Sequence, residues 1–143
     1  MLLVHATTVE ITGQGVLIRG PSGSGKSDLA LRLLDGGAQL VADDQTELSL
    51  QDDQIVARAP DTIAGLLEVR GLGIVKVVPR SWAPLALVVD LVDESRIERL
   101  PEPAYAHFLG VALPRLDLAP FQVSAAAKVR LAVASAKRDI MSS

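Results

Sequence analysis

Cysteine is absent from this 143-residue chain, and aromatic residues make up only 3% of it. The lack of cysteine excludes disulfides and thiolate metal sites, and it is compatible with a reducing compartment. The scarcity of aromatics means that a core must consist mainly of leucine, valine, isoleucine and alanine. Because 49% of the residues are hydrophobic, the chain can form such a core, and we expect one compact domain over residues 1–143.

Long apolar runs, a signal peptide and a basic cluster are also lacking. The longest apolar run, residues 83–89, contains Pro84 and has the length of a strand, so no membrane-spanning helix is expected. Residues 1–5 have no basic segment of the kind that opens a signal peptide. The net charge of −3 argues against a nucleic-acid partner. These absences predict a cytoplasmic domain without membrane or nucleic-acid partners.

Residues 20–27 form the most informative stretch, because they read GPSGSGKS and fit the phosphate-binding pattern G-x-x-x-x-G-K-[ST]. A short apolar strand is expected before it at residues 15–19, and a helix after it at residues 27–34. Glycines let the backbone wrap closely around phosphate oxygens, and the open helix start attracts an anion. We therefore expect a nucleoside triphosphate, ATP, with Lys26 on its β- and γ-phosphates and Ser27 on Mg²⁺. The residues expected to hold the nucleotide are Gly20, Pro21, Ser22, Gly23, Ser24, Gly25, Lys26, Ser27 and Asp28.

The rest of the pattern predicts a mixed sheet, because strands outnumber helices and only one helix clearly lies between strands. Residues 2–11 predict a strand that turns at residues 12–15 and brings His5 back toward the phosphate loop. The other expected strands are residues 39–42, 46–50, 54–58, 74–78, 85–92 and 113–118. The other expected helices are residues 63–67, with Asp61 as a cap, and residues 124–140. The predicted fold class is α/β, with a P-loop-containing mixed β-sheet and flanking helices.

Asp43 and Asp44 follow the expected strand 39–42 and lie 17 and 18 positions beyond Lys26. In an open α/β sheet, this position borders the ligand crevice. One carboxylate of such a pair can face Mg²⁺ while the other accepts a proton from an incoming hydroxyl. The alternative is an ordinary polar turn, but the phosphate loop upstream favours the functional interpretation.

Other charged residues are weaker candidates. Glu68 and Arg70 are suited to a metal and a phosphate respectively, but they also fit a surface ion pair beside a turn, and the choice stays open. A lone histidine in a strand, such as His5, is more often structural than catalytic. Candidates to stabilise charge on a transferring phosphate, each also compatible with a solvated surface charge, are Arg96, Arg99 and Arg115.

Four segments in order resemble the catalytic domain of the HPr kinase/phosphorylase family: His5, residues 20–27, residues 40–44 (LVADD) and residues 67–74 (LEVRGLGI). The last segment resembles the family's signature sequence and is more diagnostic than the phosphate loop. The resemblance is clear up to about residue 78 and weakens afterwards. It implies a phosphoenolpyruvate carboxykinase-like fold, ATP- and Mg²⁺-dependent phosphorylation of a serine on the phosphocarrier protein HPr of the phosphotransferase system, and a homo-oligomer, in this family a hexamer.

The resemblance also implies roles for individual residues. Asp43 matches the family's general base, and His5 matches a histidine that assists it. Lys26 and Arg99 match positions that contact phosphate, and Ser27 and Glu68 match Mg²⁺ ligands. Asp44, beside the base, stays a catalytic candidate because of the adjacent pair of carboxylates.

The chain departs from the family pattern in two places. It starts almost at His5, so we expect a short form without the family's N-terminal domain, of the type associated with alphaproteobacteria. Residues 121–125 (FQVSA) stand where the family has a glycine- and arginine-containing loop linked to dephosphorylation, which makes phosphorylase activity doubtful. Two alternatives to an HPr kinase therefore stay open. One is a kinase of the same lineage that acts on a small metabolite such as free serine, and the other is a non-catalytic ATP-binding regulatory module.

Overall fold

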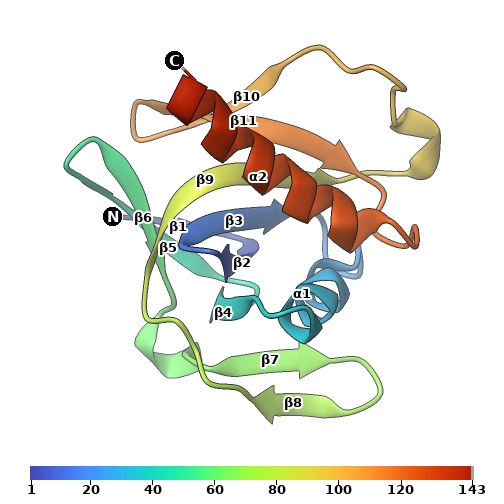
Figure 1. Ribbon diagram of the computed structural model, residues 1–143. Helices are drawn as coiled ribbons and strands as arrows, with labels where there is room; N and C mark the ends of the chain where they lie inside the picture. The colour runs from blue at the N-terminus through green and yellow to red at the C-terminus, as the bar shows by residue number, and fades with distance from the viewer. Residues whose placement is uncertain (143) are drawn as a thin grey trace.

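The computed structural model describes the backbone of residues 1–142 and the side chains of residues 1–135. Across this part of the chain, nine strands form a curled mixed sheet, two more form a separate hairpin, and two α-helices pack against one face of the sheet (Figure 1). The predicted fold class, a P-loop-containing mixed sheet with flanking helices, is confirmed.

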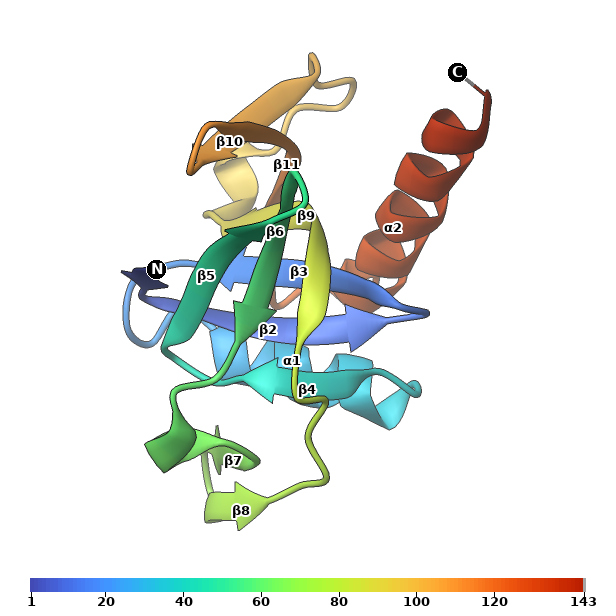
Figure 2. The same ribbon diagram turned by 90° about the vertical axis from the view of Figure 1, so that its left-hand side faces the viewer.

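The elements follow one another along the chain with short connections. The strands of the main sheet are β1 (Leu2–Val4), β2 (Ala6–Ile11), β3 (Gln14–Arg19), β4 (Gln39–Ala42), β5 (Thr46–Gln51), β6 (Gln54–Arg58), β9 (Ala83–Leu91), β10 (Ala104–Phe108) and β11 (Val111–Leu118). The hairpin and the helices are β7 (Leu66–Val69), β8 (Gly73–Lys76), α1 (Lys26–Asp35), α2 (Ala125–Ser142) and the 3-10 turns η1 (Asp61–Ile63) and η2 (Glu94–Arg96). The long strand β9 joins two halves of the sheet, because it starts antiparallel to β6 and continues parallel to β3 and β11 (Figure 2).

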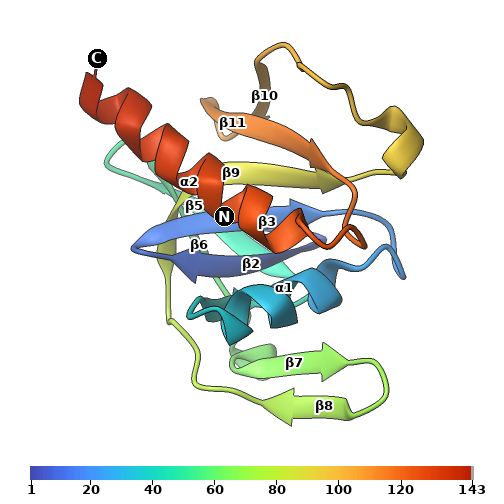
Figure 3. The same cartoon turned by 45° about the vertical axis from the view of Figure 1, so that its right-hand side comes forward.

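Four strands of the main sheet point the same way, which places their carboxyl ends at one edge. Strand β9 runs parallel to both β3 and β11 (Figure 3). Strand β4 shares their direction because β3 and β4 are each antiparallel to β2, which lies between them. The phosphate loop after β3, Asp43 after β4 and the loop after β11 therefore meet at this edge, where open α/β sheets bind their ligands.

Apolar side chains fill both faces of the sheet. On one face, Ile18 of β3 packs with Leu33 of α1 and Val129 of α2. On the other face, Leu17 of β3 and Val88 of β9 pack with residues of β5, β6 and β10, which the curl of the sheet brings over them. This alternation follows from the two-residue repeat of a strand. The position of α1, and with it the phosphate loop, is therefore set by the larger of the two cores.

Most of the expected strands and the terminal helix are confirmed within a few residues. The expected strand 2–11 is two strands, because the chain bends at His5 and β1 leaves to pair with β5. Strand β10 was not predicted. The late cationic side chains of α2 lie outside the described side chains. No helix in the described residues is both long enough and apolar enough to cross a membrane.

The expected helix 63–67 is wrong. Helix η1 ends at Ile63, and β7 begins at Leu66. Between them, Gly65 has φ +75°, which a helix does not allow, and its carbonyl accepts the N–H of Val77. Strand pairing with β8 then gives the segment its backbone hydrogen bonds and buries Leu67 in the core under α1. A partner distant in sequence decides this element, so the local pattern did not reveal it.

Because Leu67 is the one fully buried side chain of the described β7–β8 hairpin, we predict that Leu67→Ala lowers the free energy of unfolding by about 2–5 kcal/mol. The matched control is Ile74→Ala on the same hairpin, where the side chain is exposed and the change should stay within about 0.5 kcal/mol. Urea unfolding measures both. Equal effects of the two substitutions would show that the hairpin is not anchored through Leu67.

Candidate active site

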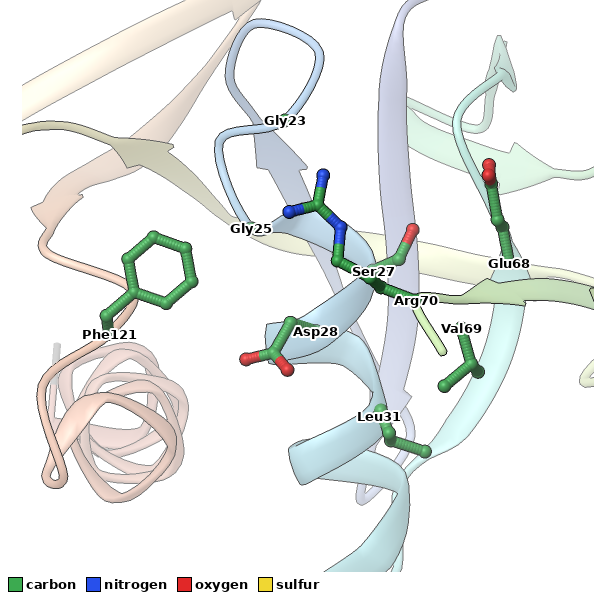
Figure 4. Close-up of a pocket in the computed structure, with 9 residues that line it drawn as sticks. All are labelled: Gly23, Gly25, Ser27, Asp28, Leu31, Glu68, Val69, Arg70 and Phe121. Atoms are coloured by element: carbon green, nitrogen blue, oxygen red, sulfur yellow. The ribbon is translucent and has the colours of Figure 1, made fainter. Parts of the chain in front are cut away.

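The phosphate loop leaves the end of β3 and leads directly into the start of α1 (Figure 4). Its Gly25 is the N-cap residue of α1 and has φ +103°, which glycine adopts at little cost. Among the side chains that the structure describes, none caps this helix start, so the N–H groups of its first turn are open toward an anion. Lys26 is buried and folds back, and its Nζ donates to the carbonyls of Gly20 at 2.8 Å and Pro21 at 3.1 Å. An ammonium has three donors, so one remains for a phosphate oxygen.

Asp43 joins three elements through its carboxylate. Its Oδ1 accepts hydrogen bonds from the hydroxyls of Thr7 at 3.0 Å and Ser27 at 2.7 Å, and its Oδ2 accepts the backbone N–H of Glu68 at 3.0 Å. The residue is only 7% exposed. A carboxylate is tolerated in such a place because its oxygens are hydrogen-bonded. Asp43 therefore fixes the start of α1 relative to β2 and β7.

Asp44 has the opposite surroundings. Its side chain is 62% exposed, and its Oδ1 lies 2.6 Å from Nε2 of His5, whose side chain is 50% exposed. The backbone of Asp44 has φ +68°, an uncommon conformation that aspartate tolerates better than most residues, and its N–H donates to Thr7 Oγ1 at 3.1 Å. Among the side chains that the structure describes, only His5 is hydrogen-bonded to this carboxylate. One oxygen is therefore oriented by His5, while the group as a whole faces solvent.

The structure brings His5 next to the phosphate loop, as the expected hairpin requires. Ala6, the first residue of β2, pairs with Arg19, the last residue of β3. His5, just before β2, and Gly20, just after β3, therefore lie at the same end of the two strands. Its contact differs from the expected one, because His5 bonds Asp44 and not Asp43. The difference follows from the positive φ of Asp44, which turns its side chain away from the sheet edge toward His5, while the side chain of Asp43 stays buried.

A pocket of about 370 Å³ opens beside the loop. The residues that line it are Gly23, Gly25, Ser27, Asp28, Leu31, Glu68, Val69, Arg70 and Phe121. In Figure 4, Phe121 stands on one side of the first turn of α1, and Glu68 and Val69 stand on the other. Glu68 and Arg70, for which the sequence left two interpretations open, both line this pocket, and within the described side chains they form no ion pair with each other. Their surroundings favour a role at the site over a surface pair.

The residues at the pocket suit a Mg²⁺ ion that takes most of its ligands from bound phosphate and water. Within the described part of the chain, no cluster of three or more histidine, cysteine or acidic residues could hold a metal on its own. Mg²⁺ typically takes one or two protein ligands together with waters and substrate phosphates. The Ser27 hydroxyl donates a hydrogen bond to Asp43, so the lone pairs of its oxygen stay available to a cation. Ser27 and Glu68 as magnesium ligands therefore fit, and stay a prediction.

Arg99 does not line the pocket. It lies in the exposed segment that follows η2. Helix η2 is itself capped by Asp93, which accepts hydrogen bonds from the hydroxyl and the backbone N–H of Ser95, and these two bonds hold the pKa of Asp93 below its ordinary value. Arg96 is the last residue of this turn and is also exposed. A phosphate contact from Arg99 stays a prediction.

Arg115 is engaged in the fold. It donates to Asp90 Oδ2 at 3.3 Å, and Arg19 binds the same carboxylate through two bonds of 2.7 and 2.9 Å. Arg19 also lies over the ring of Phe108 at 5.6 Å from its centroid. Asp90 thus links β3, β9 and β11, and its partner Arg19 is the residue directly before the phosphate loop.

Two residues of the site had no functional signal in the sequence. Thr7 lies inside a strand and reaches Asp43 and Asp44 only because β2 pairs with β4. Phe121 was noted as part of a segment that differs from the family pattern, without a role. Thr7 depends on the pairing of β2 with β4, and the loop of Phe121 depends on its hydrogen bonds to Arg32 of α1, so the local sequence pattern indicated neither.

Comparison with known proteins places these features in context. A family model described as the HPr Serine kinase C-terminal domain matches residues 1–141. The HPr kinase/phosphorylase of Geobacillus thermodenitrificans (strain NG80-2) is 40% identical over 127 residues, 80% of this chain and 41% of that protein. That of Bacillus cereus (strain B4264) is 46% identical over 96 residues, 62% of this chain and 31% of that protein. The chain therefore spans less than half the length of these curated relatives.

A solved structure shares the fold. The Hpr(Ser) kinase/phosphatase from Coxiella burnetii superposes with a TM-score of 0.83 and 25% sequence identity, over 99% of this chain and 93% of that chain. The arrangement of the curled sheet and the two helices is therefore common to both.

The contrast between the two carboxylates leads to a prediction about stability. Asp43→Asn puts an NH₂ group against a hydrogen-bond donor, and we expect it to lower the free energy of unfolding by about 1–3 kcal/mol. Asp44→Asn is the matched control, because asparagine also tolerates a positive φ and the group is solvated, so we expect a change within about 0.5 kcal/mol. Urea unfolding of the two variants measures the difference. A larger loss in Asp44→Asn would contradict the assignment of Asp43 as the structural carboxylate.

Proposed function

The chain belongs to the HPr serine kinase C-terminal domain family, and from this we propose that it is an ATP- and Mg²⁺-dependent protein-serine kinase that phosphorylates a serine of an HPr-type phosphocarrier. One observation carries the proposal. At the phosphate loop, a buried carboxylate orients the Ser27 hydroxyl, and the adjacent carboxylate, held by His5, faces outward. The first suits the donor side of a phosphoryl transfer and the second suits an acceptor hydroxyl.

On the donor side, the chain supplies positive charge and open N–H groups. The first turn of α1 and Nζ of Lys26 bind the phosphates, and Asp43 holds Ser27 in place beside them. Arg70, which lines the same pocket, adds a cation for the charge that develops on the transferred group. Bound ATP with Mg²⁺ supplies the phosphoryl group and a metal that neutralises its charge.

On the acceptor side, we assign the general base to Asp44, which revises the expectation that Asp43 has this role. Asp43 is only 7% exposed, and three of the roughly four lone-pair sites of its carboxylate already accept hydrogen bonds from the protein, so an acceptor hydroxyl from solvent has little access to it. Asp44 is exposed, and His5 orients one of its oxygens. A serine hydroxyl that approaches from solvent can therefore give its proton to Asp44 as its oxygen bonds to the γ-phosphorus of ATP, while the bond from that phosphorus to the β,γ-bridging oxygen breaks and ADP leaves.

The relatives that carry the name HPr kinase/phosphorylase support HPr as the acceptor over free serine, and the open surroundings of Asp44 suit a serine presented on a protein. The candidate base, phosphate lysine and magnesium ligands are all present, which disfavours a non-catalytic module. A single catalytic domain and assembly into a homo-oligomer, a hexamer by resemblance, stay predictions.

The test is a phosphorylation assay with ATP, Mg²⁺ and HPr-type proteins, read as phosphoserine on the acceptor. The unaltered protein should give a phosphoserine. We expect Asp44→Asn to lower kcat by about 10²- to 10⁴-fold, the usual contribution of a general base, with little change in the affinity for ATP.

The matched control is Asp53→Asn, because Asp53 is an exposed aspartate with φ +65° in the β5–β6 turn, remote from the pocket, and its activity should equal that of the unaltered protein. Absence of transfer to any HPr-type protein would refute the proposed acceptor. Full activity of Asp44→Asn would refute the proposed base. Adding inorganic phosphate to phosphorylated HPr in the same assay reports on the reverse reaction.

A further inference from the structure

Phe121 is unusually exposed for an aromatic residue in a chain that has so few. It is one of two phenylalanines, and 72% of its surface is open to solvent. The other, Phe108, is buried in the core. Aromatic side chains contribute most to stability or binding when they are buried. A ligand in the pocket that Phe121 lines could bury the exposed face of its ring.

The ring sits directly against the phosphate loop. A Cβ placed on Gly25 would lie 3.0 Å from Cζ of Phe121 and 3.2 Å from its Cε1. Any other residue at this position would be strained by the positive φ and would displace the ring by a few tenths of an ångström. The edge of the ring is therefore held close to the backbone that is expected to bind phosphate, while its remaining surface is open.

The loop that carries Phe121 is fixed on both sides of the ring. The guanidinium of Arg32 donates to the carbonyl of Pro120 and, at 3.5 Å, to the carbonyl of Gln122. Arg32 is itself paired with Asp28 one turn earlier in α1, at 3.1 Å. These bonds tie the loop after β11 to the helix that starts at the phosphate loop, so the backbone on both sides of Phe121 is anchored next to the pocket.

The two ends of the site are also distinguishable. The acceptor side is defined by Asp44 with His5, and Asp43 connects it to the backbone of Glu68. Phe121 lies across the first turn of α1 from Glu68 (Figure 4). A nucleotide with its terminal phosphate at the acceptor side therefore directs its nucleoside toward Phe121.

We propose that Phe121 is the stacking platform for the base of the donor nucleotide. The inference rests on the proposed function and extends it, because it assigns the nucleoside end of the donor to the loop after β11. Stacking on an aromatic ring suits any base, since every base has a π-face. An apolar side chain of the acceptor protein is the other possible cover for this ring, and the experiment distinguishes it.

The test is calorimetric titration of the protein with two ligands in the presence of Mg²⁺: the β,γ-imido analogue of ATP, and inorganic tripolyphosphate, which has no base. We expect Phe121→Ala to weaken binding of the nucleotide by about 5- to 100-fold, while tripolyphosphate affinity changes by less than about twofold. Phe121→Trp, which keeps a stacking surface, should retain nucleotide affinity within about threefold.

The control is Tyr105→Ala, which removes an exposed aromatic ring on β10 outside the pocket and should alter neither titration. Unchanged nucleotide affinity in Phe121→Ala would overturn the proposal, and so would an equal loss for both ligands, which indicates a damaged phosphate loop. If Phe121 instead contacts the acceptor protein, Phe121→Ala should leave the nucleotide affinity unchanged. The readout is ligand binding rather than phosphoryl transfer, so its failure is distinct from failure of the proposed function.

Discussion

The carboxylate of Asp43 is the constraint on which the site depends. It is the point where the start of α1, the strand β2 and the hairpin strand β7 meet, through Ser27, Thr7 and the backbone of Glu68. A buried carboxylate has to be matched by donors, so the burial of Asp43 and the position of the Ser27 hydroxyl determine each other. The hydrogen bond from Ser27 to Asp43 also orients the Ser27 hydroxyl oxygen, which is the expected Mg²⁺ ligand. The interaction that joins the three elements therefore also positions this ligand.

Sheet topology explains why two adjacent carboxylates can have different roles. Strand β4 ends at the edge where the carboxyl ends of the strands meet. Asp43, the next residue, stays buried at this edge, while Asp44 turns outward with a positive φ. His5 is available to meet it because β2 starts at this same edge. The phosphate loop and the loop of Phe121 arrive there for the same reason, since β3 and β11 are both parallel to β9. Donor and acceptor groups thus come from segments far apart in sequence.

Sequence reasoning succeeded where the signal is local. The phosphate loop, the strand before it and helix α1 follow from glycine spacing and apolar periodicity, and the β2–β3 turn placed His5 correctly near the loop. It failed where partners are distant. The segment around Leu67 pairs with β8 rather than forming a helix, Thr7 enters the site only through β4, and the loop that carries Phe121 is held by Arg32 of α1. The resemblance named the aspartate pair, but which aspartate contacts His5 depends on a backbone turn that the sequence pattern does not encode.

Asp43 acts through Ser27 on the metal side of the proposed reaction, while Asp44 acts on the acceptor. The most direct measurement is the rate of phosphoserine formation as a function of Mg²⁺ concentration in Asp43→Asn and Asp44→Asn. If Asp43 acts by orienting Ser27, high Mg²⁺ should restore a substantial part of the activity of Asp43→Asn, because metal binding is what that variant weakens. Asp44→Asn should stay slow at every Mg²⁺ concentration, since excess metal does not replace a proton acceptor. Rescue of Asp44→Asn by Mg²⁺, with Asp43→Asn beyond rescue, would contradict this division of roles.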